Sequence, residues 1–377
     1  IECIASLLPD RKVPLGEQGT RPEIAVLVPA HNEADVITPT LQGLLLQLNP
    51  HDRLVVIADN CTDETAHVAQ QLGVTVIERR DEQRRGKGFA LDFGLIFLCS
   101  QPPEVVVVVD ADCRVEPGAI EQIARLAAGS NRPVQAIYLM ARSATRNPKE
   151  AISALAFLVK NLVRPSGLDR MGLPCLLTGT GMAFPWAVMQ QVSWASGNIV
   201  EDMKLSLDFA LAGYPPLICR NARVTGVLPQ KARAAKSQRT RWEHGHLQTL
   251  VTQVPTLVGA ALRKQRWDLL AIALDLSVPP LSLLVAIWAL LMFLAVILAM
   301  VSSFLLPAGL LAIEGGLILV AILGAWAKFA RQDLPLGTLL AVPLYILWKI
   351  PLYISFLVKP QTKWVRTERD AIDSSKS

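Results

Sequence analysis

Residues 105–113 read VVVVVDADC, and this stretch decides the fold. Turn-forming residues flank the five valines, at 101–103 and 116–118, so the run predicts a short, fully buried strand. Asp110 and Asp112 then fall where the strand leaves the sheet. In open α/β sheets ligands bind beyond the carboxyl ends of strands, and paired carboxylates there suit a hard divalent cation that bridges to a substrate phosphate. Taken alone, the pair could equally be a polar turn that solubilises the strand end.

The composition indicates a protein with part of its mass in a membrane. The chain has 377 residues, enough for two or three domains, and only 18% of them are charged. Its mean hydropathy is +0.36. The net charge of +5 suits a membrane surface or the handling of phosphates, and we expect no nucleic-acid partner. The six cysteines form no C-x-x-C pair, which predicts reduced, mostly buried thiols without a zinc site or disulfide framework.

Before residues 105–113, three predicted strands at 24–28, 54–58 and 74–77 alternate with helices. This alternation predicts a parallel α/β sheet with right-handed crossovers. Downstream, the stretch 176–184 reads LLTGTGMAF, and its glycines allow a ligand or another backbone to come close. The predicted strands are 24–28, 54–58, 74–77, 133–141 and 176–184, and the predicted helices are 34–48, one that ends at 72, 89–98, 119–126 and 203–211.

Several polar loops follow the predicted strands. Residues 29–33 read PAHNE after the first strand, and Asp59 ends the second. The basic loop 84–88 reads RRGKG, and a lysine between glycines can approach a phosphate closely. The spacing is not that of a Walker A loop, so no ATPase is inferred. A solvated basic turn is the other interpretation of this loop.

Two segments of the second half carry charge next to helices. Glu201 and Asp202 open a helical pattern, and a helix N-terminus stabilises carboxylates, so one of the pair could serve the helix alone. The run 230–242 is basic. Such a run is usually a solvated helix face, but here it precedes membrane segments, which makes anionic headgroups or a pyrophosphate credible targets. Its cations are Lys231, Arg233, Lys236, Arg239 and Arg241.

The C-terminal third is expected to lie in the membrane. Residues 278–301 and 304–327 are each long and apolar enough to span a bilayer, and Glu314 within the second is a functional hypothesis by default. The segment 336–358 is interrupted by two prolines and a lysine, and we expect it to be interfacial or re-entrant, or to pair with an extra crossing. The segment 151–163 is too short to span and is either an interfacial helix or an ordinary core helix.

These patterns predict four regions along the chain. Residues 1–22 form a connector, which either follows a transmembrane helix upstream or stands alone. Residues 23–250 form the α/β domain, with interfacial segments near 151–175 and 230–250. Residues 251–358 form the membrane region, and residues 359–377 form a basic tail that prefers the cytosol.

The order of the acidic and basic motifs resembles the membrane-bound family 2 glycosyltransferases, which include the cellulose, chitin and hyaluronan synthases and exopolysaccharide relatives. The motifs are Asp59, D-x-D at 110–112, E-D at 201–202 and Q-x-x-R-W at 238–242, followed by membrane helices. D-x-D alone is weak, whereas Q-x-x-R-W at this distance after E-D is specific. The motifs cover roughly residues 22–250. Two clear spans are fewer than the large polysaccharide secretors have.

The resemblance implies a GT-A fold, that is, a Rossmann-like mixed sheet, and inverting transfer of a sugar from a nucleotide donor, usually a UDP-sugar. It implies Asp202 as general base, with Glu201 beside it, and Mg²⁺ or Mn²⁺ held by Asp110 and Asp112. Gly179 and Thr180 lie where related synthases present a loop to the acceptor, and Trp242 lies at the acceptor end. The donor-binding residues implied are Pro29, Ala30, Asn32, Glu33, Asp59, Lys87, Asp110, Asp112, Gln238 and Arg241.

The chemistry of sugar transfer asks for such parts independently. A leaving nucleotide develops negative charge that a metal and an arginine stabilise, and the acceptor hydroxyl must lose a proton to a carboxylate. Trp242 offers a flat apolar face to a sugar ring, although tryptophan is also a common anchor at membrane interfaces.

The leading interpretation is an integral membrane enzyme of the plasma membrane with a cytosolic catalytic domain, which extends a polysaccharide or glycan. Its expected partners are a nucleotide sugar, the acceptor, membrane lipids and polysaccharide export components. The near alternative is transfer of one sugar to a lipid, as in ceramide glucosyltransferases or polyprenyl-phosphate sugar synthases. A non-catalytic nucleotide-sugar sensor is a third reading, and a dinucleotide-dependent oxidoreductase is disfavoured because no G-x-G-x-x-G follows the first strand.

Overall fold

A computed structural model describes residues 1–9, 20–141, 148–195, 200–226, 232–332 and 334–358. The predicted basic tail and most of the predicted connector lie outside these residues, as do Lys231 and the side chains of Arg233 and Lys236. The chain forms two compact units. Among the described residues, one unit comprises 20–141 and 173–273, and the other comprises 1–9, 148–172 and 274–358. The second unit thus takes residues 148–172 out of the middle of the predicted α/β domain.

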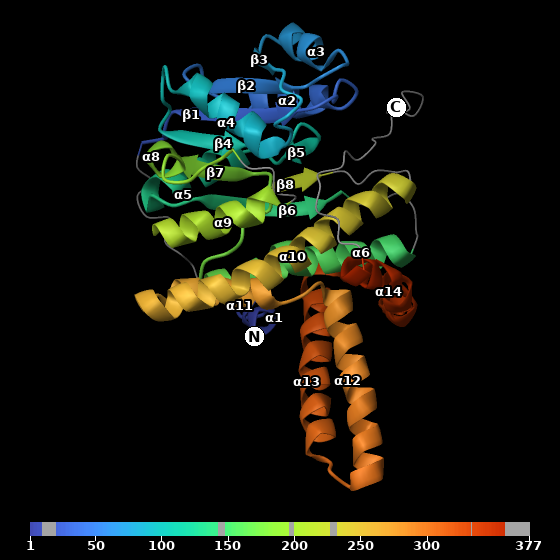
Figure 1. The fold of residues 1–377 in the computed structure, drawn as a ribbon. Helices are drawn as coiled ribbons and strands as arrows, with labels where there is room; N and C mark the ends of the chain where they lie inside the picture. Colours follow the sequence, from blue (N-terminus) through green and yellow to red (C-terminus); the bar gives the residue numbers. More distant parts are fainter. Residues whose placement is uncertain (10–19, 142–147, 196–199, 227–231, 333, 359–377) are drawn as a thin grey trace. The chain divides into compact units, whose positions relative to one another are not determined.

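The larger unit is built on one eight-stranded mixed sheet in the order β3-β2-β1-β4-β7-β6-β8-β5 (Figure 1). Strands β1 to β4 are parallel, β7 runs antiparallel to β4 and β6, and β8 runs parallel to β6. The strands are β1 Ile24–Ala30, β2 Arg53–Asp59, β3 Thr75–Arg79, β4 Val105–Val108, β5 Cys113–Val115, β6 Val134–Met140, β7 Met182–Pro185 and β8 Leu217–Gly226.

Helices bury both faces of the central strands. On one face Val26 and Val28 pack in a core with Leu41 of α2 and Ile123 of α5. On the other face Leu27 packs in a core that includes α4 and α9. Burial on both faces explains why these strands read as continuous apolar runs. The helices of this part are α2 Ile37–Leu45, α3 Thr65–Gln71, α4 Lys87–Leu98, α5 Ala119–Ser130, α8 Trp186–Met189, α9 Glu201–Ala212 and α10 Ala232–Lys264, and α11 Trp267–Ser277 begins in this unit and ends in the smaller one.

The predicted mixed α/β class is confirmed, and three details of the sheet are different. Strand β5 was not predicted. Strand β8 was not predicted, because its sequence LICRNARVTG mixes charges with apolar residues, and a bulge between Ala136 and Ile137 shifts its pairing with β6. The predicted strand 176–184 is shorter, since β7 begins only at Met182. The glycines of this stretch therefore lie in the loop before the strand, which places them near the sheet edge instead of inside the sheet.

The smaller unit contains three apolar helices that are long enough to cross a membrane, at 281–302, 306–330 and 336–358. Figure 1 shows α12 and α13 side by side as a hairpin. The third segment meets the same length and composition criteria as the other two, whereas an interfacial or re-entrant position for it stays a prediction. The elements are α1 Glu2–Ala5, α6 Pro148–Leu158, a π-helical turn 159–163, α7 Arg164–Arg170, α12 Leu281–Ser302, α13 Leu306–Ala325, a π-helical turn 326–330, a 3₁₀ helix 336–341 and α14 Val342–Val358.

The apolar segment 151–163 buries one face within this unit. Leu155, Val159 and Val163 pack in a core with Ala325 and Ala330 at the end of the second apolar helix. This packing is that of a core helix for the buried face, and an interfacial position for the other face stays a prediction.

A buried ion network joins distant segments of the smaller unit. The Arg164 guanidinium donates to Glu2, with Nε 2.7 Å from Oε2, and also to the carboxylate of Asp275. Burial works to lower the pKa of Arg164, but the charges of Asp275 and Glu2 more than offset it and raise that pKa. Helix α1 packs so closely on α7 that a Cβ on Gly167 would lie 1.9 Å from the Glu2 carbonyl oxygen. Only glycine fits at this crossing.

Candidate functional site

The D-A-D stretch lies in a short connection that is fixed at both ends. Strand β4 ends at Val108 and β5 begins at Cys113, so residues 109–112 connect these two strands. Each strand is fixed by a different partner, β4 by β1 and β5 by β8. The Asp110 N–H donates to Thr180 Oγ1 at 3.0 Å, and Thr40 Oγ1 donates to the Ala111 carbonyl at 2.9 Å. These bonds set the backbone from which the two aspartate side chains project.

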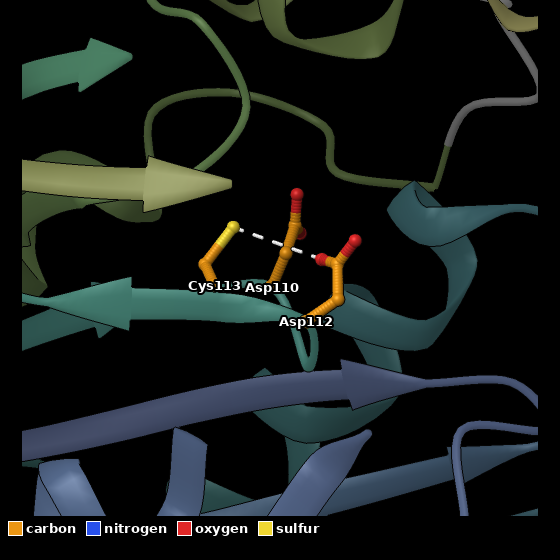
Figure 2. Close-up of side chains that lie close together, drawn as sticks. All are labelled: Asp110, Asp112 and Cys113. Atoms are coloured by element: carbon orange, nitrogen blue, oxygen red, sulfur yellow. Dashed lines mark hydrogen bonds between the residues drawn. The ribbon is translucent and has the colours of Figure 1, made fainter. Parts of the chain in front are cut away.

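Asp110, Asp112 and Cys113 form a cluster that can hold a metal ion. One potential ligand atom from each side chain lies within 4.8 Å of those from the other two. Figure 2 shows the three side chains together, with Cys113 Sγ 3.7 Å from Asp112 Oδ1. Burial, followed by the charges of Asp112 and Asp110, raises the pKa of the Cys113 thiol well above its usual range. The carboxylates suit Mg²⁺ or Mn²⁺, and the sulfur is a softer donor that Mg²⁺ disfavours.

Lys87 connects this cluster to the glycine-rich loop. Its ammonium is ion-paired with Asp110 and donates to the Gly179 carbonyl at 2.6 Å. Burial works to lower the pKa of Lys87, but the charge of Asp110 and the hydrogen bond to it raise that pKa overall. The lysine is therefore firmly cationic and lies at the meeting point of the two loops.

The loop 179–181 is held on three sides. Thr180 is fully buried and its carbonyl accepts from Gln135 Nε2 at 2.8 Å. Gly181 has a φ of +65°, and a Cβ there would lie 2.6 Å from a methyl group of Val224, so glycine is required. A Cβ on Gly179 would lie 3.5 Å from Asp202 Oδ2. The Asp202 carboxylate therefore lies against the backbone of this loop.

Glu201, the first residue of α9, is held in its neutral form near pH 7. Burial raises its pKa from 4.5 to about 8, although the cations Lys87 and Arg241 and the Gly88 N–H counteract that rise. The neighbouring Asp202 adds to it. A carboxyl group that is held neutral can donate a hydrogen bond or position its neighbours, and it cannot accept a proton as a base.

We expect Glu201→Gln to remove a pH dependence of stability. Because its pKa is raised in the folded protein, Glu201 favours folding below pH about 4.5 and this contribution is lost as the pH rises through about 8. The variant should therefore gain a few kcal/mol in free energy of unfolding at pH 8 and little at pH 4.5. Thermal unfolding in detergent across this range measures it. The exposed Glu82→Gln is the matched control, and a gain that does not grow with pH would contradict the prediction.

The Q-x-x-R-W residues lie on α10, and Arg241 acts electrostatically on Glu201. This interaction places the motif next to the E-D pair, as the resemblance implies. Among the residues that the structure describes, the buried Oε1 atom of Gln238 accepts no hydrogen bond, which suits a group that binds a ligand. Trp242 lies half-buried on the same helix.

The loops after β1 and β2 form a second polar cluster at the adjacent strand ends. Asn32 exchanges two hydrogen bonds with Thr62, from Nδ2 to Oγ1 at 2.9 Å and from the Thr62 N–H to Oδ1 at 2.7 Å. Asp59 is buried and accepts from Arg79 Nη1 at 2.6 Å. Glu33 is buried and its N–H donates to Thr65 at 2.8 Å. Pro29 and Ala30 belong to β1 itself.

The predicted site residues therefore form two separate clusters in the structure. The first group surrounds Lys87 and comprises Asp110, Asp112, Gly179, Thr180, Glu201, Asp202 and Arg241. The second is the Asn32, Glu33 and Asp59 cluster. Sequence reasoning missed Cys113 and Arg79. A sequence signal was available for each of them. Cys113 directly follows D-A-D, and Arg79 is a cation just after the end of a predicted strand, close to the acid Asp81.

Comparison with known proteins gives a family match over this site. The profile described as "Glycosyltransferase like family 2" matches residues 22–245, more than half of the chain. The probable glycosyltransferase YdaM of Bacillus subtilis (strain 168) is 23% identical over 252 residues, 63% of this chain and 59% of that protein. The probable glucomannan 4-beta-mannosyltransferase 10 of Arabidopsis thaliana is 26% identical over 254 residues, 62% of this chain and 44% of that protein. The chain thus aligns with about half of each relative.

A solved structure shares the fold along nearly the whole chain. The mannosyltransferase PcManGT from Pyrobaculum calidifontis, in complex with GDP-Man and Mn²⁺, superposes with a TM-score of 0.53 at 17% identity, covering 95% of this chain and 93% of that chain. This likeness confirms the predicted GT-A-like mixed sheet. The profile match shows that the chain belongs to the family 2 glycosyltransferases.

Proposed function

We propose that this protein transfers a sugar, with inversion, from a nucleotide-sugar donor to a glycan or polysaccharide acceptor at the cytosolic face of a membrane. The observation that carries the proposal is the meeting of Asp110, Gly179 and Asp202 around one site. Lys87 contacts the first two, and the Asp202 carboxylate lies against the backbone of the second. The proposed diphosphate site and the proposed proton acceptor would then lie side by side, which is what direct displacement at a sugar carbon requires.

A divalent metal fits this site. Asp110 and Asp112 supply oxygen ligands, which suit Mn²⁺ and Mg²⁺ alike, and the Cys113 thiol beside them is held protonated and is a poor ligand for either ion. When bound, the metal would supply Lewis-acid stabilisation of the charge that develops on the leaving diphosphate. The structural relative PcManGT carries Mn²⁺ with its donor, which supports Mn²⁺ here.

The residues around the proposed metal would divide the remaining work. Asp202 would accept the proton of the attacking hydroxyl. The neutral Glu201 would be kept in position beside it by a hydrogen bond from the Gly88 N–H. Arg241, Gln238 and Lys87 would bind the donor phosphates. The cluster of Pro29, Ala30, Asn32, Glu33 and Asp59 would hold the nucleoside. Gly179, Thr180 and Trp242 would face the acceptor.

Among the relatives, the 4,4'-diaponeurosporenoate glycosyltransferase of Staphylococcus aureus supports a lipid-like acceptor, and others of them support a polymer. One of them is named as a glucomannan mannosyltransferase, which supports polysaccharide synthesis, and PcManGT contains GDP-Man, which adds GDP-sugars to the expected UDP-sugars as donors. Incubating purified protein with radiolabelled UDP- and GDP-sugars, Mn²⁺ and membrane lipid tests the proposal. We expect label in a glycan whose size grows with time. Label in a single organic-soluble product would assign a lipid acceptor, and no transfer from any donor would contradict the proposed function.

Arg241→Lys should be poorly tolerated even though the charge is kept. A guanidinium can hold phosphate oxygens with two parallel hydrogen bonds, and an ammonium cannot. We expect turnover to fall at least about tenfold, with a weaker affinity for UDP measured by calorimetry. The matched control is Arg263→Lys at the exposed end of the same helix. Normal turnover of the Arg241 variant would mean that this residue is a surface charge.

We expect the hairpin tip between α12 and α13 to face outward. The tip at Ser302 is exposed and uncharged, whereas Lys328 and Arg331 follow at the other end, which fits the positive-inside rule. A membrane-impermeant thiol reagent applied to intact cells should label Ser302→Cys and should not label Lys363→Cys in the predicted cytosolic tail. The unsubstituted protein, with its exposed Cys99 in the larger unit, is the control. Labelling of Cys99 or of position 363 from outside would refute this topology.

A further inference from the structure

The Lys87 ammonium already satisfies the aspartate that a metal would need. It is ion-paired with Asp110 and also donates to the Gly179 carbonyl at 2.6 Å. The pair is not sealed from water, since the Lys87 side chain is 27% exposed and that of Asp110 is 33% exposed. An ammonium on a flexible stem can therefore leave Asp110 without opening the core.

A divalent cation and this ammonium compete for the same carboxylate. If both stayed beside Asp110, three positive charges would lie within a few ångströms, and their repulsion in a partly buried site would cost several-fold to tenfold or more in metal affinity. A donor diphosphate changes this balance, because it brings negative charge that the displaced ammonium can bind. Metal and donor should therefore stabilise one another's binding.

We infer that Lys87 is an internal counter-cation that makes metal binding depend on the donor. The inference rests on the proposed function and goes beyond it. Without a donor, Lys87 neutralises Asp110 and holds the Gly179 backbone next to Asp202. When metal and donor bind, the ammonium moves from Asp110 to the diphosphate. The hydrogen bond from Lys87 to the Gly179 carbonyl changes at the same time. Lys87 is thus a positioning residue that links donor binding to the loop beside the base.

The sign of the effect makes the inference testable. Removing a residue that merely binds the donor would leave metal affinity in the absence of donor unchanged. Removing a competing cation must tighten it. We expect Lys87→Gln and Lys87→Met to bind Mn²⁺ about tenfold more tightly than wild type without nucleotide, measured by the loss of the free Mn²⁺ electron paramagnetic resonance signal. UDP should raise the Mn²⁺ affinity of wild type severalfold and that of these variants much less.

Two further variants define the outcome. Lys87→Arg keeps the charge and should keep the weak, donor-dependent Mn²⁺ binding. Lys264→Gln removes a lysine charge at the exposed end of α10 and should behave as wild type. Equal or weaker Mn²⁺ binding by folded Lys87→Gln and Lys87→Met, or equal Mn²⁺ affinity of wild type with and without UDP, would overturn the inference. A wild type that binds neither Mn²⁺ nor UDP would contradict the proposed function itself.

Discussion

Asp202→Asn is expected to lower turnover by roughly 10²-fold or more, because it removes the proposed general base and keeps the shape of the side chain. The carboxylate lies against Gly179 and next to the Glu201 carboxyl, whose pKa is raised to about 8. Glu201 is thus neutral near pH 7 and cannot accept a proton, which leaves Asp202 as the candidate base. A base acts within about 3 Å of the acceptor hydroxyl, so this effect should appear in kcat and leave UDP affinity near that of wild type. Steady-state turnover and calorimetry with UDP measure the two quantities.

Two variants on the same helix separate this effect from damage to α9. Glu201→Gln keeps a neutral group at a position that is already neutral near pH 7, so it should be milder. Asp208→Asn removes an acid that pairs with Lys204 at 2.5 Å and should leave turnover close to wild type. Activity that survives in Asp202→Asn but is lost in Glu201→Gln would move the base by one residue. If both retain activity, the pair is not catalytic.

Asp110→Asn and Asp112→Asn should each weaken UDP binding in the presence of Mn²⁺ and cut turnover by about 10²-fold or more. Each change removes one ligand charge from the cluster with Cys113, and an amide oxygen is a weaker ligand for a divalent cation. Calorimetry with UDP, with Mn²⁺ and then with a chelator, measures the binding. Wild type should lose affinity when the metal is removed, and both variants should show little difference between the two conditions.

One outcome of the chelator experiment would contradict the proposed role of the metal. If wild type binds UDP equally well with and without metal, the two aspartates do not act through a metal. Asp208→Asn again serves as the matched loss of one carboxylate in the same unit, and it should keep the full metal dependence.

The parts of the fold that could be predicted are those in which local sequence and burial agree. Strands β1, β2 and β4 are apolar on both faces, so their runs are visible without any tertiary information. Strand β8 is different, since its charged residues and its bulged pairing with β6 make sense only once the partner strand is known. The same holds for β5, whose three residues pair with β8 from the far end of the domain.

The candidate site was predictable as a set of motifs, and its contacts were not. Asp110 and Asp202 each stood out by position, but no sequence pattern indicates that Lys87 bonds the carbonyl of Gly179. The raised pKa of Glu201 was also hidden, because it depends mainly on burial. Propensity and spacing report on neighbours along the chain, whereas these properties come from loops that meet at one edge of the sheet.

The Arg164 network carries a consequence for biosynthesis. Its carboxylate partners are Glu2 and Asp275. Glu2 precedes the described residues of the larger unit in the sequence, and Asp275 follows them. Chains emerge from the ribosome in order, so the guanidinium lacks one partner throughout translation of the intervening segment. All eight strands of the sheet are made before Asp275 and can pair by then, whereas the smaller unit must wait for Asp275 and the helices after it. We therefore expect the larger unit to become protease-resistant on nascent chains before the smaller unit does.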